Sequence, residues 1–146
     1  TALLDSLDSY RYLFLRQFVG LNGTYNNGSH TAVATSSDYA YIENVRTIDK
    51  AIRGVYASLL PDLNSPLVLN ADGTLTDITV AQLENDAKPN LDQMVRDQEL
   101  SAYAIIISPD QDIQTTGTLV VTIELIGIGV ARNITVNIGY VLQLSQ

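Results

Sequence analysis

The residues of this chain that could support catalysis are few, and they gather between positions 29 and 38. His30 is the single histidine, Ser29 precedes it and Asp38 follows eight positions later. These three residue types can supply a nucleophile, a general base and an orienting carboxylate. A serine nucleophile also needs a strained turn and an oxyanion hole, and no Gly-x-Ser-x-Gly pattern surrounds Ser29. The sequence therefore favours a His30 at a hairpin tip, solvated or in a local hydrogen bond, and predicts that the protein is not an enzyme.

Acidic residues in predicted loops are the second set with chemical potential. Their carboxylates could in principle hold calcium, but their spacing does not match the twelve-residue loop with its closing Glu. Aspartate at turns and helix caps explains them better. Gly117-Thr118 lacks the upstream glycine and the lysine of a phosphate loop. We therefore expect neither a metal nor a cofactor. The aspartates are Asp62, Asp72, Asp77, Asp110 and Asp112.

Composition restricts the partners of the chain. The net charge is −8 and the pI is about 4.3, which argues against nucleic-acid binding, because phosphate contacts need a clustered basic surface. No run of about 18 apolar residues exists, so direct membrane insertion is not expected. The chain has no cysteine, and 46% of its residues are hydrophobic. We expect one globular domain, alone or with a fragment of another attached.

The clearest predicted helix covers residues 38–61. Ser37 or Asp38 is its expected cap, and Pro61 ends it. Apolar residues spaced by three or four predict a buried face. That face comprises Ile42, Val45, Ile48, Ile52, Val55 and Leu59. The opposite face carries Glu43, Arg46, Asp49, Lys50 and Arg53, with Glu43–Arg46 and Asp49–Arg53 spaced for helical ion pairs.

A second helix is predicted after an extended piece at 67–69 and a turn at 71–73. Thr76 or Asp77 should cap it. Pro89 lacks an amide hydrogen, so it should kink the helix or divide it into 77–88 and 89–98. The expected apolar face comprises Val80, Leu83, Ala87, Leu91 and Met94.

Strand patterns dominate the rest of the chain. Residues 101–107 predict a buried strand, and 109–112 an acidic turn. From 117 to 146 the residues alternate with period two on either side of Gly127-Ile-Gly129, which predicts a long C-terminal β-hairpin. The fold class is therefore α+β, with helices packed on one face of a mainly antiparallel sheet that ends in this hairpin.

Residues 1–37 do not read as the start of a domain. Residues 3–7 predict the end of a helix, 10–16 a strand and 20–23 a turn, while Asn27-Gly28 predicts a hairpin. We expect 1–37 to be the tail end of a preceding domain, and 38–146 to be a separate C-terminal domain.

Several stretches together resemble the C-terminal part of contractile tail sheath proteins, most closely those of phages and phage-like elements of the Bacteroidetes type. The first of these is the helical stretch Asp38-Tyr-Ala-Tyr-Ile-Glu-Asn-Val-Arg-Thr-Ile-Asp-Lys-Ala-Ile-Arg53. The others are Leu59-Leu-Pro61, Gly73-Thr-Leu75 and Thr135-Val-Asn-Ile-Gly-Tyr140. Upstream, 12–16 and 23–31 are similar to the last strands of the sheath's middle domain. The resemblance implies a structural subunit that polymerises helically around an inner tube and contracts to drive the tube through a membrane.

The resemblance also implies partners and contacts. Expected partners are further sheath subunits, the inner tail tube protein, and baseplate and tail-terminator proteins, in a phage tail assembled in the bacterial cytoplasm. Extended chain ends of such sheaths pair with sheets of neighbouring subunits. The expected strand-exchange residues are Ile134, Val136, Ile138, Tyr140 and Leu142. The expected tube or subunit contacts are Arg46, Asp49, Lys50 and Arg53, and the alternative for these four is a solvated helix face. The alternative is a baseplate or tail-terminator adaptor that binds tail components without polymerising.

Overall fold

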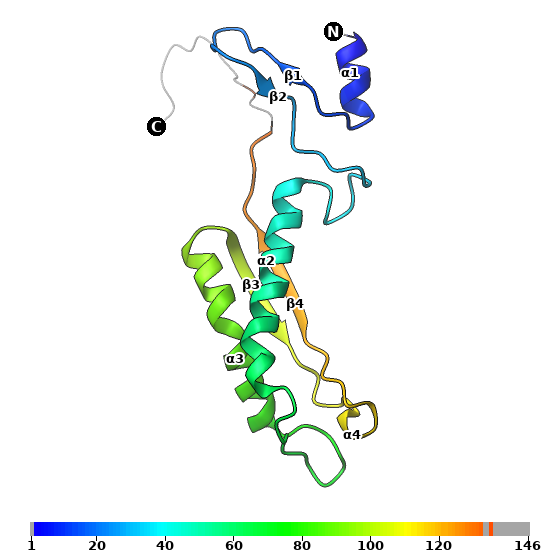
Figure 1. Cartoon of the computed structure of the whole chain (residues 1–146), viewed down its shortest axis with the longest axis vertical. Coiled ribbons are helices and arrows are strands. Elements are labelled where there is room, and N and C mark those ends of the chain that lie inside the picture. The colour runs from blue at the N-terminus through cyan, green and yellow to red at the C-terminus, as the bar shows by residue number, and fades with distance from the viewer. Residues whose placement is uncertain (1, 133–134, 136–146) are drawn as a thin grey trace, which may run out of the picture.

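A computed structural model describes residues 2–132 and residue 135. It is elongated, with an N-terminal segment at one end and α4 at the other (Figure 1). Two long helices and a two-stranded sheet form its body. The elements are α1 (Ala2–Ser9), β1 (Leu15–Arg16), β2 (Tyr25–Asn26), α2 (Ile42–Leu59), the 3₁₀ helix η1 (Leu60–Asp62), α3 (Asp77–Arg96), β3 (Leu100–Ile106), α4 (Ile113–Thr116) and β4 (Thr122–Gly127). No helix in the described ranges is long and apolar enough to cross a membrane.

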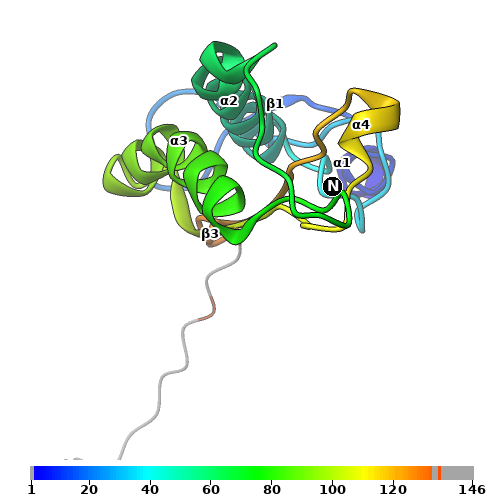
Figure 2. The ribbon, with the colours of Figure 1, turned by 90° about the horizontal axis from the view of Figure 1, so that it is seen from below.

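The predicted α+β class is confirmed, with α2 and α3 on the same side of the sheet (Figure 2). The main core lies between the two helices and the inner sheet face. Its buried residues are Ala51, Val55, Ala87, Leu91, Met94 and Leu100. Tyr103 and Ile105 of β3, and Ile123 and Leu125 of β4, pack against this cluster. Alternation with period two therefore places one face of each strand on the helices.

A second buried cluster holds the far end of the domain together. Leu75, Leu83 and Ile107 form it. Thr76 caps α3 as predicted, since its side chain accepts a hydrogen bond from the Thr79 amide. The predicted turn at 71–73 is also formed: Gly73 has a φ of +87°, and Asp72 accepts from the Thr74 amide.

Helix α2 departs from its prediction in two ways. It begins at Ile42 after Tyr41, without a side-chain cap, so capping by Ser37 or Asp38 is wrong. The buried side of α2 is centred on Ala51 and Val55, whereas Ile42 and Ile52 are about half exposed. Small residues face α3 because the two helices pack closely, as Gly54 against Asn90 illustrates.

Helix α3 is one continuous helix from Asp77 to Arg96, with Pro89 inside it. The predicted division at Pro89 is wrong. Ala87 and Leu91, which flank the proline, are both fully buried, so burial against α2 and the sheet outweighs the missing amide hydrogen. The predicted apolar face is confirmed by its four buried members Leu83, Ala87, Leu91 and Met94.

Strands β3 and β4 pair antiparallel, with Ala102 opposite Ile126 and Ile106 opposite Thr122. The predicted glycine turn at 127–129 is not formed, because β4 ends at Gly127 and neither glycine has a positive φ. The predicted return strand of the long C-terminal hairpin lies outside the described residues. In the described part of the chain, β4 pairs with β3 alone.

The N-terminal segment consists of α1 and the short β1–β2 pair. Leu15 pairs with Asn26 and Arg16 with Tyr25, so the connection runs through Gly20 and Gly23. The predicted hairpin turn at Asn27-Gly28 is therefore wrong. Asn27 instead uses its side chain to bond the Phe14 amide, the Tyr12 carbonyl and Asp8.

Candidate functional site: exposed assembly surfaces

The four charged residues predicted to make contacts lie together on α2, and all four are exposed. They help to line a groove of about 1090 Å³ between the first half of α2, the corner at residues 98–100 and the end of β4. The groove is open, and its β4 side includes Ile123, Leu125 and Ile128.

The predicted ion pairs within α2 are wrong. Arg53 Nε donates to the backbone oxygen of Asp49 at 3.1 Å, and not to its carboxylate. Lys50 Nζ lies 2.5 Å from Glu99 Oε2 at the corner that precedes β3. Glu43 pairs with Arg132. In the described part of the chain, Arg46 and Arg53 make no ion pair. They are therefore more available than Lys50 for contacts with another protein.

Apolar residues share the outer surface of α2 with these charges, and sequence reasoning assigned two of them to the core. The α2 ridge, as we define it, runs outward along the helix at spacings of four and three. It comprises Ile42, Arg46, Asp49, Arg53 and Tyr56. Tyr56 is 66% exposed, and Ile52 beside the ridge is 53% exposed. A mixed apolar and cationic surface of this kind is typical of protein–protein contacts.

The sheet offers two further bare surfaces. Its outer face carries Ile106 and Ile126, which are 46% and 62% exposed, and Val120, two residues before β4, is 59% exposed. Beside them Glu124 stands opposite Ala104. The second surface is the free edge of β4, which has no strand partner besides β3 in the described residues. An unpaired edge next to apolar side chains is a ready template for another strand.

The predicted strand-exchange residues Ile134, Val136, Ile138, Tyr140 and Leu142 lie outside the described residues. The described chain before them continues from β4 as a strap, defined here as residues 128–132. Arg132 at its end reaches the start of α2. The origin of the C-terminal segment is therefore fixed, although its pairing remains a prediction.

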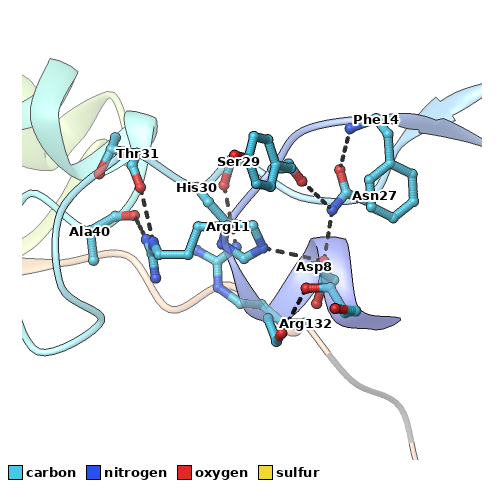
Figure 3. Close-up of polar contacts among 12 residues, drawn as sticks. Asp8, Arg11, Phe14, Asn27, Ser29, His30, Thr31, Ala40 and Arg132 are labelled. Carbon is cyan, nitrogen blue, oxygen red and sulfur yellow. Dashed lines mark hydrogen bonds and ion pairs between the residues drawn. The ribbon is translucent and has the colours of Figure 1, made fainter. Parts of the chain in front are cut away.

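Of the three residues first considered for catalysis, Ser29 and His30 lie at this junction, and they do not form a catalytic triad with Asp38 (Figure 3). His30 Nε2 lies 3.6 Å from Asp8 Oδ1 of α1, and no contact joins His30 to Asp38. The Ser29 hydroxyl accepts from Arg132 at 3.3 Å. His30 is not a solvated hairpin tip, since its side chain is only 17% exposed and its ring packs on Tyr41 with centroids 5.5 Å apart. The arrangement joins segments of the chain that are distant in sequence.

Arg132 makes the most elaborate contact of this junction. Its guanidinium lies 3.5 Å from the centre of the Tyr41 ring and donates to Glu43 Oε1 at 2.5 Å. Burial by itself raises the pKa of Glu43. Hydrogen bonds from Ser29, from the Glu43 amide and from Arg132, together with the positive charge of Arg132, outweigh burial, so the pKa of Glu43 is lowered overall. Arg11 adds a second tie by donating to the backbone oxygens of Thr31 and Ala40. The N-terminal segment, α2 and the strap are thus fastened together.

This fold is shared with a chain in a solved structure described as "Cryo-EM structure of the anti-feeding prophage (AFP) baseplate, 6-fold symmetrised". The match has a TM-score of 0.74 at 18% identity and covers 97% of the present chain. It covers 39% of the other chain, so the present chain spans about two-fifths of that relative's length. At this identity the likeness establishes the fold.

The sequence itself gives the family. Residues 38–145 match the family model described as "DUF2586, C-terminal domain", and the chain therefore belongs to this family. No curated protein sequence matches the chain.

Proposed function

We propose that this chain is part of a structural subunit of a contractile injection particle, in particular of a sheath subunit that polymerises helically around an inner tube. The observation that carries the proposal is the fold shared over 97% of the chain with a component of the anti-feeding prophage baseplate. The exposed surfaces described above support it, because they suit repeated protein–protein contacts and not the binding of a small substrate.

The proposed mechanism relies on many weak contacts. Exposed ion pairs made by Arg46 and Arg53 would each contribute about 0–1 kcal/mol. Repeated along a helical polymer, such contacts set the register between subunits or against the tube, and they can be broken when subunits repack. Strands exchanged at the β4 edge would keep subunits linked during that change, in an open head-to-tail assembly. No catalytic residue or cofactor takes part.

The domain assignment belongs to the same proposal. Residues 1–37 would be the tail end of the preceding sheath domain, and 38–146 the C-terminal domain. Two observations support this division: the family match begins at residue 38, and no residue of α1 is buried. The chain also spans only part of its structural relative.

A baseplate module that binds tail components without polymerising is the second candidate. The description of the matching structure as a baseplate favours it. In that case the α2 ridge and the β4 edge would contact other baseplate proteins, and the localisation to a phage-like particle would be unchanged.

Electron microscopy of the purified full-length protein separates the candidates. Striated tubes support the sheath, closed rings or discrete complexes support a baseplate or terminator role, and monomers with catalytic turnover contradict both. Deleting residues 134–146 should leave a folded protein that no longer polymerises. Tubes of normal length from the truncated protein would refute strand exchange. The double variant Arg46→Glu/Arg53→Glu should lower the yield of tubes, whereas the matched control Lys88→Glu on α3 should not.

A further inference from the structure

The path of the strap is set by two contacts at different positions along the axis of α2. Gly127, the last residue of β4, pairs with Leu100, next to the corner where Glu99 binds Lys50. Arg132 binds Glu43, seven residues earlier on α2, which corresponds to roughly 10 Å along the helix axis. Five extended residues span at most about 17 Å. The strap therefore runs onward past the corner, and it does not turn back along β4.

Arg132 is the residue that holds the strap there. Residues 128–131 are all exposed, and none of them makes a hydrogen bond within the described part of the chain. The Arg132 side chain is 33% exposed and contacts Ser29, Tyr41 and Glu43. Tyr41 and Glu43 lie at the start of α2, and Ser29 lies in the segment that joins β2 to α2. The contacts of the Arg132 side chain are therefore the specific contacts that hold the end of the strap.

We propose that Arg132 is a positioning residue that clamps the strap to the start of α2 and so holds residues 128–132 away from the β4 edge. The strap then ends at the start of α2, where the Arg132 side chain contacts Ser29. The turn at 127–129 that the sequence predicted for a return hairpin onto β4 of the same chain is not formed. The clamp thus leaves the β4 edge open to a strand from a second copy. This last consequence rests on the proposed function, whereas the clamp itself does not.

Hydrogen exchange measured by mass spectrometry on the full-length protein tests the clamp. Arg132→Ala should speed amide exchange about ten-fold at the start of α2 and at residues 29–31, because a charge-assisted, partly buried contact is lost. Arg132→Lys keeps the charge without the two-atom donor geometry or the planar stack on Tyr41, and it should show an intermediate increase. The matched control is Arg96→Ala, because among the described residues the Arg96 side chain hydrogen-bonds only Gln93 on its own helix. It should change neither segment.

The yield of polymer, measured by electron microscopy and sedimentation, tests the positioning role. Arg132→Ala should lower it several-fold while Arg96→Ala leaves it unchanged. Unchanged exchange at residues 29–31 and 41–43 in Arg132→Ala overturns the clamp. Faster exchange with undiminished polymer overturns the positioning role. If the wild-type protein forms no polymer, the proposed sheath function fails, and the exchange data still decide whether the clamp exists.

Discussion

Gly54 of α2 and Asn90 of α3 pack directly against each other, and this contact gives a sharp test of how the two helices are joined. A Cβ added at Gly54 would lie 1.9 Å from Asn90 Oδ1 and 2.0 Å from its Cγ. Overpacking of this kind costs about 1–3 kcal/mol. In a helix interior, replacing glycine with alanine otherwise stabilises by up to about 1 kcal/mol. Gly54→Ala should therefore lower the free energy of unfolding by about 0–2 kcal/mol.

The sign of the effect should reverse when Asn90 is shortened. In an Asn90→Ala background the clash is gone, so Gly54→Ala should stabilise by up to about 1 kcal/mol. Asn90 Oδ1 is buried without a hydrogen-bond partner, so its removal leaves no partner group unsatisfied. Urea unfolding of the four variants in the double-mutant cycle measures the coupling, which we expect at about 1–3 kcal/mol. Equal stabilisation by Gly54→Ala in both backgrounds would refute the packing described here.

Two further predictions concern the core and the junction. Leu91 is fully buried, so Leu91→Ala should cost about 2–5 kcal/mol in urea unfolding, whereas Ile78→Ala, at a residue 81% exposed, should stay within about 0.5 kcal/mol of wild type. Similar losses for both variants would contradict the assigned core. The pKa of Glu43 is lowered below its ordinary 4.5 in the folded state, so its contribution to stability is present above that value and is lost as the pH falls through the lowered pKa. The stability advantage of wild type over Glu43→Gln should therefore shrink on acidification, and an advantage that grows at low pH would show that the Arg132 contact does not hold the carboxylate.

Local patterns in the sequence predicted the elements but not all of their partners. Helix α3 was predicted well because its cap, its turn and its apolar spacing are all local signals. The predicted division of α3 at Pro89 was wrong, because burial of Ala87 and Leu91 outweighs the loss of one helical hydrogen bond. On α2 the large apolar residues Ile42 and Ile52 were assigned to the core, whereas close packing of the two helices requires small residues such as Ala51.

The pairing of distant segments was harder to predict. The alternation in 119–126 predicted a strand, and β4 forms at Thr122–Gly127. Period two does not identify the neighbouring strand, and β4 pairs with β3. The charged residues of α2 were correctly expected on the surface. The tie from Arg132 to Ser29 and Glu43 spans 103 and 89 positions, and no short-range spacing announces it. The one local feature of the sequence that points to this contact is Arg132 itself, an isolated arginine shortly after Gly127-Ile-Gly129.

A cryo-electron microscopy reconstruction of the assembled full-length protein, at a resolution that traces each chain, tests the central claim most directly. The account predicts a helical polymer in which a strand from a second copy lies along the β4 edge, and in which each C-terminal segment begins at the Arg132 junction. Tubes or rings whose β4 edges carry no added strand would contradict strand exchange. A particle in which residues after Arg132 pair with β4 of the same chain would contradict the proposal that this edge is open to a strand from a second copy.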